Sequence, residues 1–186
     1  MKKTSSLRFI GIDPGTNITG YGVIEIASGE LKLLDLGVIT MQSKDEHPEK
    51  LKDIFQAIQA LVNRFQPHEM AIEAPFYSKN IQSMLKLGRA QGVVMAAAMV
   101  SGIPVTEYAP RKVKQSITGK GNATKEQVAA MLKHILGTRL EETLPDATDA
   151  LAVAICHYYQ HSSITNGSKR YKDWSAFLKD NPTRNG

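Results

Sequence analysis

The order of apolar segments is the feature that most limits the folds open to this chain. Three strand-like segments come first, at Leu7–Asp13, Gly20–Ile26 and Leu31–Thr40, and short turns that contain Gly or Pro connect them. Strands joined by such short turns pair as antiparallel neighbours. The sequence therefore predicts a three-stranded antiparallel meander at the start of the fold.

Helices and strands alternate after the meander. Apolar residues recur at helical spacing over Pro48–Phe65, and the strand Met70–Glu73 follows this helix, so it should run parallel to the first strand. The sequence predicts an α/β fold with a five-stranded mixed sheet and helices on both faces. The remaining expected elements are a helix over Asn80–Val100, a strand over Pro104–Tyr108, a helix that Thr124 caps and that runs through Leu136, with Gln127 completing a capping box, and a last helix from Pro145 to about Tyr159.

The helix expected over Asn80–Val100 carries a stripe of apolar and small residues on one face. Gly88 and Gly92 lie four residues apart in this stripe, so another backbone could approach closely there. We expect the stripe to pack on the protein's own sheet, and a contact with a second copy of the chain is the alternative. The stripe comprises Ile81, Met84, Leu85, Gly88, Gly92, Met95, Ala96 and Met99.

Length and composition fit one folded domain followed by a basic tail. With 186 residues, 42% of them hydrophobic and 22% charged, the chain can bury a sizeable core. From Ser162 onward the composition turns polar, with more bases than acids. We therefore expect a domain over residues 1–161 and a mobile basic tail over residues 162–186.

The sequence favours a cytoplasmic protein. Cys156 is the single cysteine and lies in an apolar helical stretch, so it fits a small buried side chain in a reducing compartment. The apolar run after the basic N-terminus ends at Asp13, which is too soon for a signal peptide. Because no apolar stretch is long enough to span a bilayer, we expect no membrane partner.

Four carboxylates stand where such a fold could bring them together. Asp13 and Glu73 end two strands that are expected to be parallel neighbours, and sites in open α/β sheets gather at that edge. Asp146 and Asp149 lie three residues apart on one face of the last helix. Acids beside apolar runs are costly to bury unless a positive charge meets them, so a divalent metal site is predicted.

Each acid also has a local structural explanation. Asp13 precedes Pro-Gly and could stabilise a turn, and Glu73 could be a solvated charge. Asp146 could cap the last helix, and Asp149 could favour its positive end, although apolar residues follow on the same face. These four explanations must hold independently, whereas one site accounts for all four acids.

The acids match the needs of phosphodiester hydrolysis. Two Mg²⁺ ions held about 3.5–4 Å apart can activate water and stabilise the attacked phosphate and the leaving oxygen. Mg²⁺ prefers oxygen ligands and retains several waters, so a few carboxylates suffice. The sequence shows neither a Cys/His spacing typical of zinc nor a Gly-x-Ser-x-Gly nucleophile motif.

The basic residues point to a polyanionic partner. The formal net charge is +5, and there is no acid from Ala74 to Thr106 or from Arg111 to Lys125. A single charge run is more often a solvated surface, but two runs that flank the acids favour contact with phosphate. The cations that are candidates for contact with a phosphate backbone are Lys79, Lys86, Arg89, Arg111, Lys114, Lys120 and Lys125.

Several motifs occur together in a family-specific order. The segments Phe9-Ile-Gly-Ile-Asp13-Pro-Gly-Thr, Ala71-Ile-Glu73-x-x-Phe76, Leu85-Lys-Leu-Gly-x-Ala-x-Gly92, Tyr108-Ala-Pro-x-x-Val-Lys114 and Asp146-Ala-Thr-Asp149-Ala-Leu-Ala-Val-Ala-Ile-Cys-His157 resemble the crossover junction endodeoxyribonuclease RuvC of bacteria. The resemblance covers roughly residues 7–160.

The resemblance implies an RNase H-like nuclease domain that acts in recombination and repair. It implies a homodimer that binds four-way (Holliday) DNA junctions and nicks two opposing strands symmetrically with Mg²⁺ or Mn²⁺, two ions per active site. The helix over Asn80–Val100 is the candidate dimer interface, because a two-fold dimer suits a junction with near two-fold symmetry. The branch-migration proteins RuvA and RuvB are implied partners.

The resemblance also implies roles for individual residues. Asp13, Glu73, Asp146 and Asp149 fall on the family's metal-binding acids, and Lys114 and Lys125 match basic positions near the scissile phosphate. Lys114 is therefore a fifth candidate catalytic residue. Phe76 matches an aromatic residue that stacks on a junction base, although an isolated Phe is more often a core contact.

Three other functions compete with this interpretation. An actin-like or sugar-kinase-like ATPase shares the Asp-x-Gly-Thr turn but needs a second such domain, for which the chain is too short. A YqgF-type nuclease or RNase H has the same fold, and the motifs around Glu73 and Leu85 favour RuvC. A junction-binding protein without cleavage would present acids to DNA, and acids without metal repel phosphate.

Overall fold

The sheet has the predicted mixed topology. The computed structural model describes residues 6–42, 46–75, 80–137 and 144–165. The sheet order is β3-β2-β1-β4-β5, with antiparallel pairing from β1 to β2 and β2 to β3, and parallel pairing from β1 to β4 and β4 to β5. The strands are β1 (Leu7–Asp13), β2 (Ile18–Ala27), β3 (Glu30–Thr40), β4 (Glu69–Glu73) and β5 (Val105–Tyr108).

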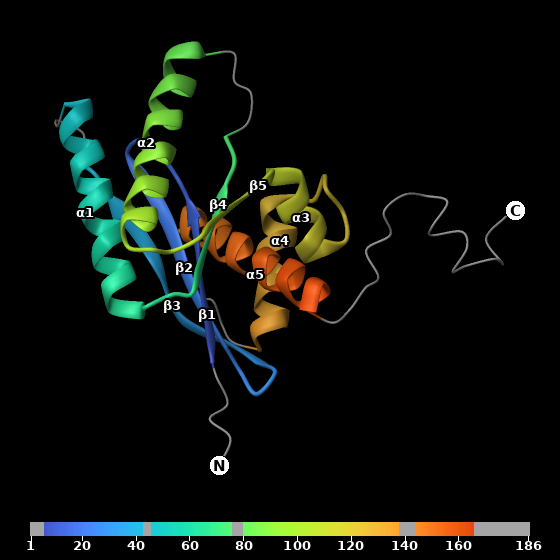
Figure 1. The fold of residues 1–186 in the computed structure, drawn as a ribbon. Helices are drawn as coiled ribbons and strands as arrows, with labels where there is room; N and C mark the ends of the chain where they lie inside the picture. Colours follow the sequence, from blue (N-terminus) through green and yellow to red (C-terminus); the bar gives the residue numbers. More distant parts are fainter. Residues whose placement is uncertain (1–5, 43–45, 76–79, 138–143, 166–186) are drawn as a thin grey trace, which may run out of the picture.

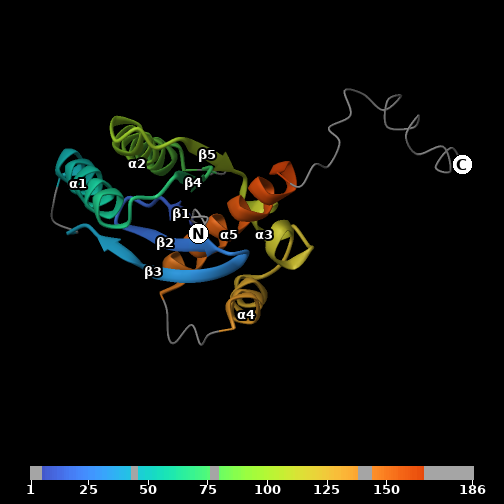
Figure 2. The same cartoon turned by 60° about the horizontal axis from the view of Figure 1, so that its bottom comes forward.

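The helices cover both faces of the sheet, as Figures 1 and 2 show. Strand alternation creates two cores: Ile10 and Ile12 of β1 pack with one helix layer, and Phe9 packs with the other. Helices α1 and α2 cover the first face, and α3, α4 and α5 cover the second. Their bounds are α1 (His47–Phe65), α2 (Ile81–Val100), α3 (Pro110–Thr118), α4 (Lys125–Leu136) and α5 (Pro145–Thr165).

Local signals explain where two of these helices begin and end. The capping box predicted at the start of α4 is confirmed, because Thr124 accepts from the backbone of Gln127 and the Gln127 side chain accepts from Thr124. Helix α3 was not predicted. Its signals are Pro110 at the first turn and Gly119 at the C-cap, where φ is +76°.

The packing predicted for α2 is wrong. The residues of α2 that are buried against the sheet include Ala90, Val94 and Ala98, which lie on a different side from the predicted stripe. Leu85 remains about half exposed, at 51%, and a side chain at Gly88 would meet open space. Ile81, Leu85 and Met99 of the stripe are therefore exposed, whereas Met95 at its margin packs against the core. A contact of the exposed part with a second copy stays a prediction.

The backbone of α5 lies directly on β1 and β2. A Cβ at Gly11 would overlap the carbonyl oxygen of Ala150, and a Cβ at Gly20 would overlap that of Asp146. Gly22 is similarly close to Leu151, since a Cβ at Gly22 would lie 2.8 Å from the Leu151 Cα. Any side chain at these three positions would push the first turns of α5 away from the sheet.

Helix α5 extends past its predicted end near Tyr159, to Thr165. The predicted boundary between residues 161 and 162 thus lies within this helix, and the division into a domain and a mobile tail stays a prediction because residues 166–186 lie outside the described ranges. Among the helices that the structure describes, none has the length and apolarity needed to cross a membrane.

We expect Gly11→Ala to destabilise the fold, because its methyl group would overlap the α5 backbone. Overpacking of this kind costs about 1–3 kcal/mol in the free energy of unfolding, which urea unfolding can measure. Gln56→Ala is the control, since Gln56 lies on the exposed side of α1 and its replacement by a strong helix former should leave stability unchanged or raised. Equal stability of both variants would contradict the proposed close approach.

Candidate active site

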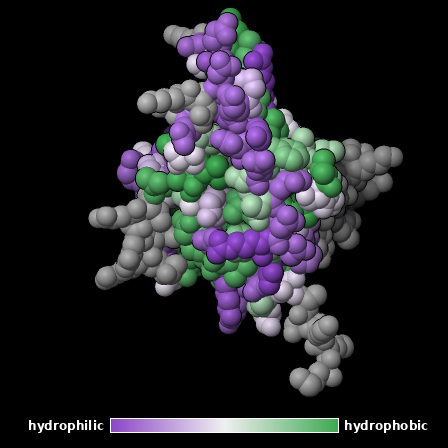
Figure 3. Space-filling model, turned by 90° about the vertical axis from the view of Figure 1, so that its left-hand side faces the viewer, coloured by the Kyte–Doolittle hydropathy of each residue, from purple (hydrophilic) through white to green (hydrophobic). Residues whose placement is uncertain are grey.

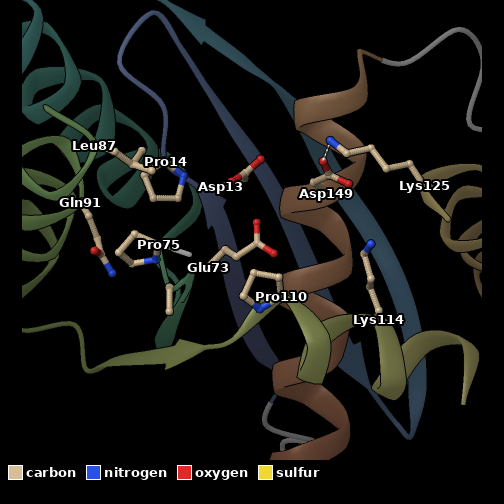
Figure 4. Close-up of a pocket in the computed structure, with 11 residues that line it drawn as sticks. Asp13, Pro14, Glu73, Pro75, Leu87, Gln91, Pro110, Lys114, Lys125 and Asp149 are labelled. Carbon is tan, nitrogen blue, oxygen red and sulfur yellow. Dashed lines mark hydrogen bonds and ion pairs between the residues drawn. The ribbon is translucent and has the colours of Figure 1, made fainter. Parts of the chain in front are cut away.

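The sheet and α5 bring the predicted acids to one edge of the sheet. Ile12 of β1 pairs with Ile72 of β4 in parallel register, so the next residues, Asp13 and Glu73, lie level at adjoining strand ends. The first turn of α5 supplies Asp146, and Asp149 follows in the next turn. Figure 4 shows Asp13, Glu73 and Asp149 directed toward a common space.

A cavity of about 270 Å³ contains this space. Asp13, Glu73 and Asp149 line it, and Lys125 of α4 and Lys114 of α3 line it on the same side as Asp149 (Figure 4). Asp146 is not part of the lining, but its charge acts on both Asp13 and Lys125. The remaining lining residues are Pro14, Ala74, Pro75, Leu87, Gln91 and Pro110.

Burial and mutual repulsion hold a proton on this group of acids. Burial, followed by the negative charges of Glu73, Asp149 and Asp146, raises the pKa of Asp13 from 3.8 to about 8. Burial also raises the pKa of Glu73, while a hydrogen bond from Asp13 and the nearby charges of Lys125 and Lys114 act in the opposite direction. Near neutral pH the pair therefore shares a proton when no cation is present.

Lys125 offsets part of the negative charge. Its Nζ donates to Asp149 Oδ2 at 2.6 Å, and this hydrogen bond raises the pKa of Lys125. The Lys125 side chain is nevertheless 62% exposed and that of Asp149 21%, so solvent reaches the ion pair from the lysine side and screens it. Lys114 reaches the same space from α3 (Figure 4).

The residues present fit a divalent cation. Carboxylate oxygens are the donors that Mg²⁺ and Mn²⁺ prefer, and a cation would remove the repulsion that raises the pKa of Asp13. Within the described ranges, no three His, Cys, Asp or Glu side chains already stand together in an arrangement that could hold an ion. The Lys125–Asp149 pair and the proton shared with Glu73 use carboxylate oxygens that a cation would need.

Other candidate residues are distributed unevenly around the cavity. Lys86 and Arg89 are exposed on α2 and are not part of the cavity lining, and their charges act on His47 at the start of α1. Arg111 is exposed on α3, and its side chain lies over Gly121. Lys120 lines a different cavity, between α3 and α4, and Phe76 and Lys79 lie outside the described residues.

Sequence reasoning missed Gln91 as a cavity residue. Its side chain is 7% exposed, and its Nε2 donates to Glu107 Oε2 of β5 at 2.7 Å. Gln91 follows Ala90 and precedes further apolar residues of the helix. A polar residue in such a setting is a weak signal of a buried side chain that has a hydrogen-bond partner. The partner itself could not be predicted, because it comes from a different element.

Comparison with known proteins identifies the family of this chain. The family model described as "Crossover junction endodeoxyribonuclease RuvC" matches residues 9–157. The chain belongs to the RuvC family. The family match makes it an endodeoxyribonuclease of a metal-dependent class, and its RNase H-like fold agrees with the prediction.

Curated RuvC proteins match nearly the whole chain. The Cytophaga hutchinsonii protein is 51% identical over 98% of this chain and 90% of the relative, and the Porphyromonas gingivalis protein is 51% identical over 94% and 95%. The solved structure "T. thermophilus RuvC in complex with Holliday junction substrate" is 32% identical, has a TM-score of 0.79, and covers 86% of this chain and 97% of that chain.

We expect the raised pKa of Asp13 to make metal-free stability depend on pH. The folded chain retains a proton that the unfolded chain releases, so the stability contribution of Asp13 falls as the pH rises from about 4 to about 8. Asp13→Asn should therefore be more stable than the wild type by a margin that grows over this range toward an upper bound of roughly 6 kcal/mol.

Chemical unfolding in EDTA at about pH 5 and about pH 9 measures this margin. Saturating Mg²⁺ serves as the control, because a bound cation should stabilise the wild type and narrow or reverse the difference. A margin that stays constant with pH would show that Asp13 ionises freely in the folded protein.

Proposed function

We propose that this RuvC-family chain resolves four-way DNA junctions in recombination and repair by nicking two opposing strands symmetrically. The observation that carries the proposal is the cavity that acids from β1, β4 and α5 line together with two lysines from α3 and α4. Acids that hold cations and lysines that meet phosphate are the two components that phosphodiester hydrolysis requires. The solved T. thermophilus RuvC structure is of a complex with a Holliday junction substrate.

Asp13, Glu73, Asp146 and Asp149 are the proposed metal ligands. Two Mg²⁺ ions, for which Mn²⁺ could substitute, would supply an activated water and stabilise charge on the phosphate and leaving oxygen. The acids position that centre because each comes from a rigid element. Lys114 is the proposed catalytic cation beside the scissile phosphate, and Lys125 binds phosphate once it leaves Asp149.

Cations in the cavity and on neighbouring helices form the proposed DNA-binding surface. Lys114 and Lys125 line the cavity, and Lys86 and Arg89 are exposed on α2 near the start of α1. Arg111 and Lys120 extend the surface along α3 and the loop after it. Lys79 and Phe76 lie outside the described residues, and the sequence alone supports their proposed roles. Lys79 would contact DNA, and Phe76 would stack on a junction base.

Dimerisation through α2 is part of the proposal. The side of the molecule that carries α1 and α2 shows hydrophobic patches between hydrophilic side chains (Figure 3). On α2, Ile81, Leu85 and Met99 are exposed, and Gly88 and Gly92 have open space beside them. A two-fold dimer built on this helix presents two active sites to a junction with near two-fold symmetry. We further propose a cytoplasmic location and cooperation with RuvA and RuvB.

Purified protein should nick a synthetic four-way junction in Mg²⁺ and leave linear duplex of the same sequence intact. Asp13→Asn should lower the nicking rate by ~10²-fold or more, because it removes an electrostatic component of the centre, while junction binding in EDTA is retained. Native gels and denaturing gels measure binding and nicking separately. Equal cutting of junction and duplex would refute resolvase activity.

Leu85→Asp should convert a dimer to a monomer, because it places a charge in the exposed stripe of α2. Light scattering coupled to gel filtration measures the solution mass. Leu34→Asp on β3 is the matched control, since Leu34 is also exposed, at 37%, but lies on another element. A wild-type monomer that junction DNA does not dimerise would contradict the interface.

A further inference from the structure

A buried histidine joins three elements beneath the active site. His157 of α5 is 4% exposed, and its Nδ1 lies 2.9 Å from the Tyr108 hydroxyl. Its Nε2 lies 3.0 Å from Glu69 Oε2 at the start of β4. The ring of Phe9 packs edge-on against the imidazole, with 4.9 Å between centroids, and His161 approaches the other Glu69 oxygen at 3.5 Å.

The partners fix the proton positions in this chain of hydrogen bonds. An ionised Glu69 only accepts, so His157 Nε2 carries the hydrogen and Nδ1 accepts from the Tyr108 hydroxyl. Burial lowers the pKa of His157 and raises the pKa of Tyr108 to about 12, so a neutral imidazole and an intact phenol are the favoured forms. The hydrogen bonds therefore have one direction, from Tyr108 through His157 to Glu69.

The chain of hydrogen bonds begins beside a candidate metal ligand. Tyr108 is the register partner of Glu73 across the β4–β5 pair, and its carbonyl accepts from Ala74 N at 2.9 Å. His157 stands on α5 about two turns beyond Asp149. The Tyr108–His157 bond thus links the strand pair that ends in Glu73 to the helix that carries the other acids.

This link extends the packing of α5 on the sheet, because His157 lies on the same side of the helix as Ala150 and Ala154, which meet Gly11. Toward β1 and β2, the helix is held by backbone contact at Gly11 and Gly20. Toward β4 and β5, it is held by directional hydrogen bonds from His157 to Tyr108 and Glu69. Packing limits how close the helix comes, whereas a hydrogen bond also fixes its position along its axis.

We propose that Tyr108 and His157 are positioning residues that set the separation between Glu73 and the α5 acids, and thereby the affinity of the site for its divalent cation. The inference rests on the proposed metal-dependent function of this cavity. Neither Tyr108 nor His157 is itself part of the cavity lining, so neither is a ligand or a catalytic group. A displacement of the ligands by a fraction of an ångström is enough to weaken a coordination site.

Two variants separate the positioning role from general stability. Tyr108→Phe removes only the hydroxyl, and His157→Gln keeps an amide that can donate to Glu69 while losing the acceptor for Tyr108. Cys156→Ala is the matched control, because Cys156 is the buried neighbour on α5 and bonds instead to Ser116, at 3.2 Å. Thermal unfolding of all three variants ranks their stability.

Binding of Mn²⁺ to the protein alone, followed by the EPR signal of free Mn²⁺, is the decisive measurement. We expect Tyr108→Phe and His157→Gln to weaken Mn²⁺ binding roughly tenfold and to lower kcat for junction nicking while KM stays near the wild-type value. Cys156→Ala should leave Mn²⁺ affinity unchanged even where it lowers Tm as much.

Unchanged Mn²⁺ affinity in both variants, or an equal loss in Cys156→Ala, would overturn the positioning role. If one of the two variants does not fold, the other decides the question. Failure of the proposed function is distinguishable, because it would appear as wild-type protein that binds Mn²⁺ but does not nick a four-way junction.

Discussion

The contact of the α5 backbone with β1 and β2 is the constraint on which the rest of the structure depends. Glycines at positions 11, 20 and 22 leave no side chain between the helix and the two strands. The carbonyl oxygen of Asp146 therefore lies against Gly20, beside the end of β1. A helix held at the usual distance by interposed side chains would leave its acids short of Asp13 and Glu73.

This close approach concentrates negative charge at the carboxyl ends of β1 and β4. The raised pKa of Asp13 reflects burial together with three neighbouring carboxylates, and the lysines of α3 and α4 offset only part of that charge. The repulsion between these carboxylates lowers the free energy of unfolding at this edge of the sheet. Binding of a cation and a phosphate would restore that stability. The sheet and the hydrogen bonds of His157 to Tyr108 and Glu69 hold β4, β5 and α5 in place against this repulsion.

The sequence predicted the topology and the grouping of acids because both depend on local patterns. Alternating apolar strands, short turns and a helical crossover determine that Asp13 and Glu73 end adjacent parallel strands. The side of α2 that packs on the sheet could not be predicted, since two apolar sides compete on one helix and only tertiary contacts choose between them. Gln91 and the three glycines were missed for the same reason, because their roles depend on atoms from other elements.

The contact between Lys125 and Asp149 has a consequence for how the site changes state. The ammonium group stands at the first residue of α4 on a largely exposed side chain, so it can move away through rotation of its own side chain alone. The same movement frees the Asp149 carboxylate and places the positive charge of Lys125 elsewhere around the cavity. On the proposed function, the metal-free form of the site therefore carries its own exchangeable counter-ion, and loading with a divalent cation would be an exchange of charges rather than a rearrangement of the fold.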